Sequence, residues 1–429
     1  MATSPILAEP HAGLLVSLQR WRLALRLPLF SFAIIAFLGL SWCEVHNIDV
    51  DFHSSLAHND LVGRWYGTRA ALQGQDPFSL PVTRQIRAMG HDVSAAFDYP
   101  AHLAVLILPL AVLPWKAASL VYLAVVIPSL ALSIWLCIRL LAPALSPQAT
   151  SLVTLLAFSS WPFVWGIRLW QPGLLTAVFV FFAWFLLSRG HGYGAGILLA
   201  CATIKPQLVL PLLLGLLLWA GLRRQWSFIL SFTFATIILL ALAELVVPGW
   251  FPHWIAATRS YQAFCGKLPL EILLGTIPSR ALALSLILGT GWRIWQIRRC
   301  QASSAAFGYT VALLLSVAVA ITFTIPFMIY NDMLLLPGCV LLFRATSSTT
   351  LQLLARRFAQ ICLAWTFLCV PVAILLRAFS SSPLDWDKLV FLNPFLASAV
   401  TLFLLLHPPV GYAHEEILRP ALDPTAQSA

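Results

Sequence analysis

Apolar runs with the length of a membrane-spanning helix recur along most of the chain. A helix needs roughly 20 apolar residues to cross a hydrocarbon core of about 30 Å. Because the runs are continuous, they predict helices, about twelve in number. These spans are expected near 27–44, 100–114, 116–138, 149–167, 173–188, 192–221, 226–247, 281–297, 305–327, 333–343, 358–377 and 389–406. The sequence therefore predicts an all-α, polytopic membrane protein.

Two polar stretches interrupt this pattern. The first covers 45–98 and the second 248–280, and both are expected to be outer loops between spans. The domain division that follows has a cytoplasmic N-terminal tail, a transmembrane domain containing both loops, and a cytoplasmic C-terminal tail. Their expected ranges are 1–26, 27–410 and 411–429.

The first loop contains a predicted amphipathic helix over 60–73, which we expect to lie on the membrane surface. Leu61, Trp65 and Leu72 recur on one face at helical spacing. Gly74 and the Asp-Pro pair after it are typical of the turn that ends such a helix. In the second loop, aromatic residues predict a belt at the membrane interface. They are Trp250, Phe251, Trp254 and Tyr261.

Composition supports the membrane interpretation and adds an orientation. Of the 429 residues, 60% are hydrophobic and 10% are charged, whereas soluble domains average about 25% charged residues. The net charge is +10, carried mostly by arginines at span ends. Because basic residues accumulate on the cytoplasmic side, we expect an inner (cytoplasmic) membrane protein with a cytoplasmic N-terminus and both loops outside. With twelve spans, single arginines at 139 and 189 are exceptions to this rule.

The run over 192–221 contains Lys205-Pro206 at its centre. A lysine at membrane depth costs about 2.5–3.5 kcal/mol on insertion scales, and the chain has only four lysines. The run is either one kinked span or a hairpin that turns at this pair. Lys205 is either a lysine that snorkels to the interface or a cation that receives an anionic headgroup.

Other polar residues could join Lys205 in an outward-facing cavity. Asp60 is a good helix N-cap and also a candidate general base. Arg280 begins a span, where it is either an interfacial anchor or a phosphate partner, and Tyr330-Asn331-Asp332 is either a loop turn or a polar corner of the cavity. The histidines and cysteines lack metal-ligand spacing, so we expect no metal and no cofactor.

A carboxylate together with several cations favours one class of reaction. A phosphate is already a good leaving group, so it needs cations, and an acceptor hydroxyl needs one base. Glycoside hydrolysis normally uses two carboxylates. The set therefore predicts sugar transfer from a polyprenyl phosphate. A transporter or flippase of a lipid-linked sugar is the alternative, although no repeat relates the two halves. A non-catalytic subunit of an envelope-assembly complex is a third.

Three stretches together resemble glycosyltransferase family 87, a family of GT-C fold. They are DLVGRWYGTRAALQGQDPFS at 60–79, continued by Tyr99-Pro100; the block 170–210 from WQPG to KPQLVL; and YNDMLLLP at 330–337. In the second block Trp170 stands where Gly is usual before Gln171. Asp60 falls where the family has its first-loop aspartate.

This resemblance implies a GT-C-like bundle and an inverting, metal-independent hexosyltransferase of the cell envelope. The hexose, typically mannose, would pass from a polyprenyl-phosphate sugar donor to a lipid or glycan acceptor on the outer face of the membrane. Asp60 would be the catalytic base. The residues expected to bind substrate are Arg64, Tyr66, Tyr99, Gln171, Lys205, Arg259, Arg280, Tyr330 and Asp332.

Overall fold

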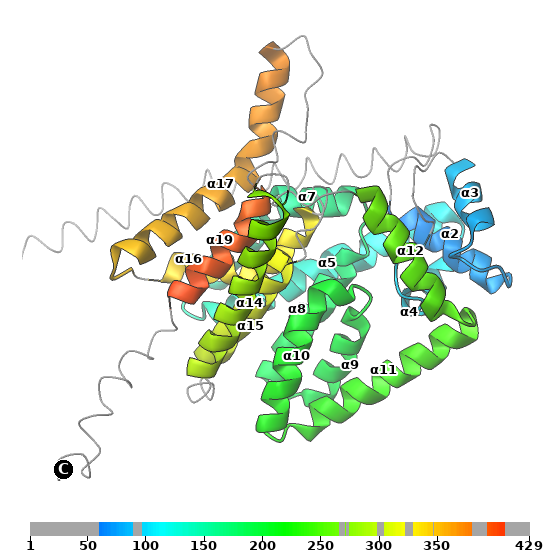
Figure 1. The fold of residues 1–429 in the computed structure, drawn as a ribbon, viewed down its shortest axis with the longest axis horizontal. Helices are drawn as coiled ribbons and strands as arrows, with labels where there is room; N and C mark the ends of the chain where they lie inside the picture. The colour runs from blue at the N-terminus through cyan, green and yellow to red at the C-terminus, as the bar shows by residue number, and fades with distance from the viewer. Residues whose placement is uncertain are drawn as a thin grey trace, which may run out of the picture.

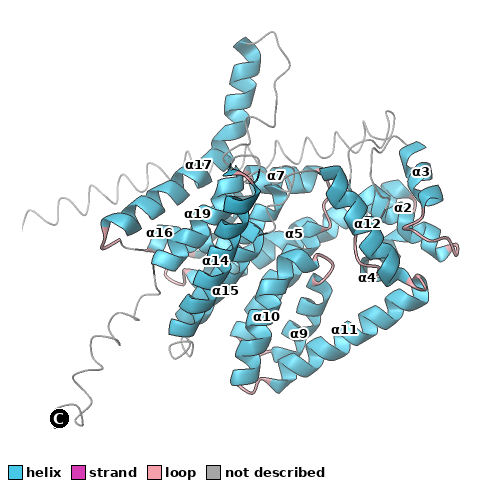
Figure 2. Cartoon of the chain, viewed as in Figure 1, coloured by secondary structure: helices cyan, strands magenta, loops and turns pink. Residues whose placement is uncertain are grey.

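The computed structural model describes residues 60–88, 97–265, 271, 274–297, 304–321, 329–345, 347–379 and 393–407. This part of the chain is helical and contains no strand (Figures 1 and 2). The helices are α2 (Asp60–Leu72), α3 (Leu80–Ala88), α4 (His102–Ala111), α5 (Trp115–Leu141), α6 (Pro147–Phe158), α7 (Trp161–Arg168), α8 (Gly173–Ser188), α9 (Gly192–Ala202), α10 (Pro206–Leu222), α11 (Trp226–Val246), α12 (Trp250–Cys265), α14 (Thr276–Ile297), α15 (Ser304–Ile321), the 3-10 helix η1 (Ile329–Leu335), α16 (Leu336–Arg344), α17 (Thr350–Phe379) and α19 (Asn393–Leu406). The predicted first span and both predicted tails lie outside the described residues.

Two of the described helices, α5 and α11, are each long and apolar enough to cross a membrane. The pair α6 and α7 adds a third candidate if it is counted as one span, although the two helices meet at an angle of 63°. Shorter apolar helices surround them, among them α4, α8, α9 and α10. The all-helical, apolar architecture agrees with a membrane protein, whereas the number of twelve spans stays a prediction.

The apolar run over 192–221 forms two helices, α9 and α10. Gly192 and Gly196 let α9 approach α11 closely, because a side chain at either position would collide with Ser227 or Ser231. Gly192 faces Ser227 and Gly196 faces Ser231. Because both residue numbers increase together, α9 and α11 run in the same direction. Since α10 leads into α11 through a short turn, α10 runs the opposite way (Figure 1).

Lys205 therefore lies at the tip of a hairpin, and the alternative of one kinked span is wrong. The sequence permits the turn because Pro206 occupies the first position of α10, where its missing N–H costs nothing.

Helix α5 runs alongside α8 in the same direction. At one end, the rings of Trp115 and Trp170 stack with centroids 5.4 Å apart. Further along, the thiol of Cys137 donates to the carbonyl oxygen of Phe181 at 3.8 Å. Consequently α5 and α8 end at the same side of the bundle, opposite the Lys205 turn.

This arrangement gathers the basic span ends on one side. Gly192 packs against Ser227, so the turn before α9 and the turn before α11 lie together. Residues at the ends of α5, α8 and α16 line one cavity. Arginines at this end include Arg139, Arg189, Arg223, Arg224 and Arg344. Arg139 and Arg189, exceptions under the predicted span count, thus join the others, and we call this side the arginine end.

The two predicted loops meet at the other end, where α12 lies beside α2 and α4 (Figure 1). The imidazole Nδ1 of His253 lies 2.9 Å from a carboxylate oxygen of Asp76. The indole N–H of Trp254 donates to the carbonyl oxygen of Asp98 at 3.2 Å. Trp250 is buried, whereas Phe251 is exposed. The predicted aromatic belt is thus in part a packing surface between the loops.

Helix α2 has nearly the predicted bounds, but its packing differs from the expected surface helix. Four consecutive residues at its start, Leu61–Arg64, are buried, and Leu72 is exposed. Consecutive buried positions cover more than one face of a helix. Helix α2 packs against α4 and α3, so neighbouring helices cover much of the surface that the sequence assigned to lipid.

Candidate functional site

Four polar turns converge opposite the arginine end. They are the start of α2, the segment before α4, the turn between α7 and α8, and the Lys205 turn; η1 packs against α7 beside them. The backbone N–H of Asp60 donates to the carbonyl oxygen of Leu169 at 2.9 Å, which ties α2 to the α7–α8 turn. Segments distant in sequence therefore contribute to one polar cluster.

The α7–α8 turn depends on a strained residue. Trp170 has a φ of 49°, a left-handed conformation that costs a side-chain-bearing residue roughly 1–2 kcal/mol. Glycine adopts this φ freely, which explains why glycine suits this position. Here the Trp170 side chain is 2% exposed and stacks on Trp115, so burial offsets the strain. The turn presents Gln171 to the cluster.

Lys205 is a buried cation with neutral partners. Its side chain is 2% exposed, and its Nζ donates to Gln171 Oε1 and Asn331 Oδ1, both at 3.4 Å. The ammonium lies 4.4 Å from the ring centroid of Tyr330 and 5.7 Å from that of Tyr99. These hydrogen bonds are long, and no carboxylate of the described residues forms an ion pair with Lys205. An anion would satisfy this ammonium better than its present partners.

Gln171 is held from two sides by tyrosines. The hydroxyl of Tyr99 donates to Gln171 Oε1 at 3.2 Å, and the hydroxyl of Tyr122 donates to the Gln171 carbonyl oxygen at 2.8 Å. All three residues are buried. The side-chain oxygen of Gln171 is therefore fixed where it receives the ammonium of Lys205.

Asp60 and Asp98 share one arginine. Nη2 of Arg64 lies 2.5 Å from Asp98 Oδ1, and Nη1 donates to the backbone oxygen of Asp60 at 2.9 Å. The Asp60 carboxylate is 4.0 Å from Nη1. Arg64 also lies over the ring of Tyr99, 5.0 Å from its centroid. The side chains of Arg64 and Asp98 are 7% and 10% exposed, so this is a buried ion pair.

The Asp60 carboxyl is more accessible than that of Asp98. About a third of the Asp60 side chain is exposed. The pKa of Asp60 is raised above its ordinary value, chiefly because the surrounding protein displaces water; Arg64 opposes this shift, Asp98 adds to it, and Lys205 opposes it. A reachable carboxylate with a raised pKa is a better proton acceptor than a surface aspartate.

Four of the predicted site residues lie apart from this cluster. Tyr66 packs against the α2–α3 contact, where its hydroxyl donates to Gln85 at 3.2 Å. Arg259 is exposed on α12, and the exposed Arg280 lies 3.6 Å from Glu271. Asp332 is buried, and its two carboxylate oxygens have no hydrogen-bond partner. The roles expected of these four residues stay predictions.

Two members of the cluster were not among the predicted site residues. Asp98 directly precedes Tyr99, and Asn331 lies between the predicted Tyr330 and Asp332. An acidic residue at the last position before a span was the available signal for Asp98. Asn331 contacts Lys205, whereas Asp332 lines an apolar cavity on the other side of η1, a distinction that a short polar motif does not reveal.

The cluster thus combines a buried ammonium, available to an anion, with a partly accessible carboxylate. Within the described ranges, no three His, Cys, Asp or Glu side chains are grouped to hold a metal ion. Such a site can bind a phosphate and accept a proton from a hydroxyl group.

Comparison with known families identifies the family of this chain. The family model described as glycosyltransferase family 87 matches residues 97–322, more than half of the chain. The match includes Tyr99, Gln171 and Lys205 and begins after Asp60. No curated protein and no solved structure matches this chain. The chain belongs to glycosyltransferase family 87, and the protein is a membrane glycosyltransferase.

Proposed function

We propose that this enzyme transfers a hexose, mannose in the first instance, from a polyprenyl-phosphate sugar donor to a lipid or glycan acceptor. Lys205 is the main support for this proposal. Its buried ammonium has only neutral hydrogen-bond partners and lies close enough to Asp60 to lower the pKa of that carboxyl. A phosphodiester in contact with this ammonium would supply the missing counter-charge.

In the proposed reaction, Asp60 takes the proton of an acceptor hydroxyl group. The acceptor oxygen then attacks the anomeric carbon, and the bond between that carbon and the phosphate oxygen breaks with inversion. Lys205 stabilises the charge that develops on the departing polyprenyl phosphate. The reaction needs no metal, because the leaving phosphate is stabilised by the protein's own cation.

Arg64 has a positioning role in this proposal rather than the phosphate-binding role expected from the sequence. Its guanidinium is already engaged by Asp98 at 2.5 Å and by the backbone oxygen of Asp60. These contacts fix the start of α2, and with it the direction of the Asp60 side chain.

The orientation that we propose places the polar cluster at the outer face of the cytoplasmic membrane. It rests on the arginine end, which the positive-inside rule assigns to the cytoplasm. The N-terminus is then cytoplasmic, as the basic residues before the first apolar run indicate. A polyprenyl-linked donor would reach the cluster from the outer leaflet.

The test is incubation of the purified protein with isotopically labelled polyprenyl-phosphate mannose and extracted membrane lipids. Mass spectrometry should detect a lipid or glycan that carries one labelled hexose, in the presence of EDTA as well as in its absence. A second arm holds the protein in proteoliposomes with donor but no acceptor. Donor movement across the bilayer without any hexose-shifted product would refute transfer and favour a transporter. Loss of product in EDTA would refute the metal-independent step.

A further inference from the structure

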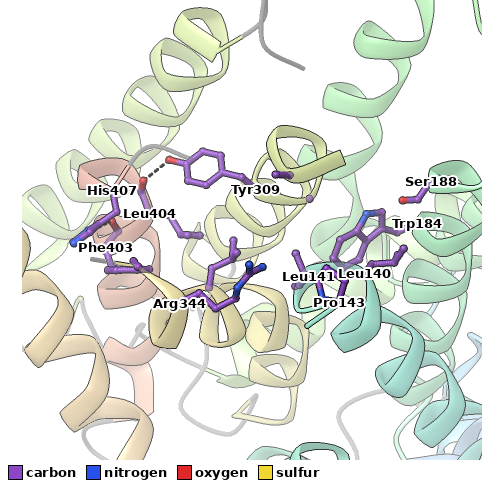
Figure 3. A pocket seen from close by; sticks show the side chains of 14 residues that line it. Leu140, Leu141, Pro143, Trp184, Ser188, Tyr309, Arg344, Phe403, Leu404 and His407 are labelled. Carbon is purple, nitrogen blue, oxygen red and sulfur yellow. Dashed lines mark hydrogen bonds between the residues drawn. The ribbon is translucent and has the colours of Figure 1, made fainter. Parts of the chain in front are cut away.

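Two cavities meet at Arg344, at the end of the bundle opposite the polar cluster. The smaller, of about 310 Å³, lies among the ends of α5, α8, α15, α16 and α19. Its polar or aromatic lining residues include Trp184, Ser188, Tyr309 and His407. Figure 3 shows the guanidinium of Arg344 pointing into this cavity from α16.

The polar groups of the smaller cavity other than Arg344 are largely engaged. The hydroxyl of Tyr309 donates to the carbonyl oxygen of Leu404 (Figure 3). Nδ1 of His407 lies 2.9 Å from the carbonyl oxygen of Phe403, and its Nε2 lies 3.1 Å from the Ser347 hydroxyl. Arg344 is exposed and makes no hydrogen bond or ion pair with the described residues. It is thus the cation that remains available in this cavity.

The larger cavity, of about 1080 Å³, is apolar and extends between α5, α6, α7, α16 and α17. Its lining includes Val153, Leu156, Phe343, Leu363 and Phe367, and Arg344 belongs to it as well. Ligand sites typically have volumes of about 300–1,000 Å³, so this cavity can accept a long hydrocarbon chain. Together the two cavities are complementary to an amphiphilic ligand, because Arg344 lies where they meet and the larger cavity extends from it with an apolar lining.

We infer that these cavities bind one anionic glycerophospholipid, with its phosphate at Arg344 and an acyl chain in the apolar cavity. Charge complementarity favours this occupant, because Arg139 and Arg189 lie at the same end as Arg344. Basic pockets between membrane helices on the cytoplasmic side bind anionic headgroups. The site is separate from the Lys205 cluster, so the lipid would act as a bound structural partner of the bundle and not as the sugar donor.

Native mass spectrometry of the purified protein tests this inference, with phosphatidylglycerol and phosphatidylcholine of identical acyl chains as probes. The wild type should retain phosphatidylglycerol preferentially. Arg344→Gln should reduce this retention about fivefold, which corresponds to the ~1 kcal/mol of a basic residue at an anionic membrane surface. The matched control is Arg223→Gln, an exposed arginine at the same end that lines neither cavity; it should leave retention unchanged.

Two further measurements test the site if Arg344→Gln does not fold. Ala364→Trp places a ring in the apolar cavity, which Ala364 lines from an exposed position, and should lower retention of both lipids. In the wild type, phosphatidylglycerol should raise Tm more than phosphatidylcholine, because a ligand of the native state stabilises it. Equal retention and equal Tm with the two lipids would overturn the inference. Stronger retention of a polyprenyl phosphate than of phosphatidylglycerol would overturn the assignment to a glycerophospholipid.

Discussion

Replacing Lys205 with methionine separates a functional cation from a structural one. Methionine has a similar length and an apolar, adaptable side chain. The ammonium of Lys205 is almost fully buried, its two hydrogen bonds measure 3.4 Å, and their acceptors are neutral amide oxygens. Such partners only partly offset the cost of removing a charge from water. Lys205→Met should therefore leave Tm unchanged or raise it.

In contrast to Tm, the activity of Lys205→Met should fall. A hydrogen bond to a charged group contributes about 1.5–3 kcal/mol, and each ~1.4 kcal/mol corresponds to a factor of ten in rate. If Lys205 holds the donor phosphate, the substitution should lower kcat/KM for the donor about 10- to 150-fold.

Donor-dependent initial rates and thermal unfolding should be measured on the same preparation. The matched control is Lys116→Met, an exposed lysine in the first turn of α5; it should keep its activity. A Lys205→Met protein with wild-type kcat/KM would refute the phosphate role. A parallel fall in activity and Tm would instead indicate that Lys205 stabilises the fold.

Three further predictions concern the neighbours of Lys205. A Cβ at Gly173 would lie 2.9 Å from Lys205 Nζ, so Gly173→Ala should displace the ammonium and lower kcat/KM for the donor. In a Lys205→Met background the same change should lower kcat/KM no further, and additive losses would contradict this coupling. Arg64→Ala leaves the buried Asp98 carboxylate unpaired and should destabilise the fold by about 3–5 kcal/mol, measured by thermal or denaturant unfolding, with an unchanged stability as the contrary result. Because Asp60 must be ionised to act as base and its pKa is raised, kcat/KM should rise with pH through a midpoint above the ordinary aspartate value of about 3.9; a midpoint at or below that value would argue against Asp60.

Hydropathy predicted the positions of helices well but not their directions. The predicted spans 173–188 and 226–247 nearly coincide with α8 (Gly173–Ser188) and α11 (Trp226–Val246). The run over 192–221 permits both a kinked span and a hairpin, because a continuous apolar run has no marker of reversal other than the Lys-Pro pair itself. The direction of α9 depends on its contacts with α11, and such contacts are not visible in a local pattern.

Side-chain burial was the least predictable property of the site. Asp60, Lys205 and Tyr330 come from separate segments, and the structure brings them to one cluster. The position of Arg280 at the start of an apolar run also predicted a phosphate partner, yet its side chain is exposed. A charge beside an apolar run is equally compatible with a surface anchor and with a buried site, and only the packing of α12 and α14 distinguishes them.

Asp60→Asn is the decisive substitution, because it removes the proposed base and keeps the size of the side chain. The measurement is formation of the hexose-shifted product from labelled polyprenyl-phosphate mannose and membrane lipids by purified, folded protein. Asp76→Asn, a change in the same loop at a residue that contacts His253, serves as the matched control. We expect product with the wild type and with Asp76→Asn, and none with Asp60→Asn. Wild-type product formation by Asp60→Asn would show that Asp60 is not the catalytic base.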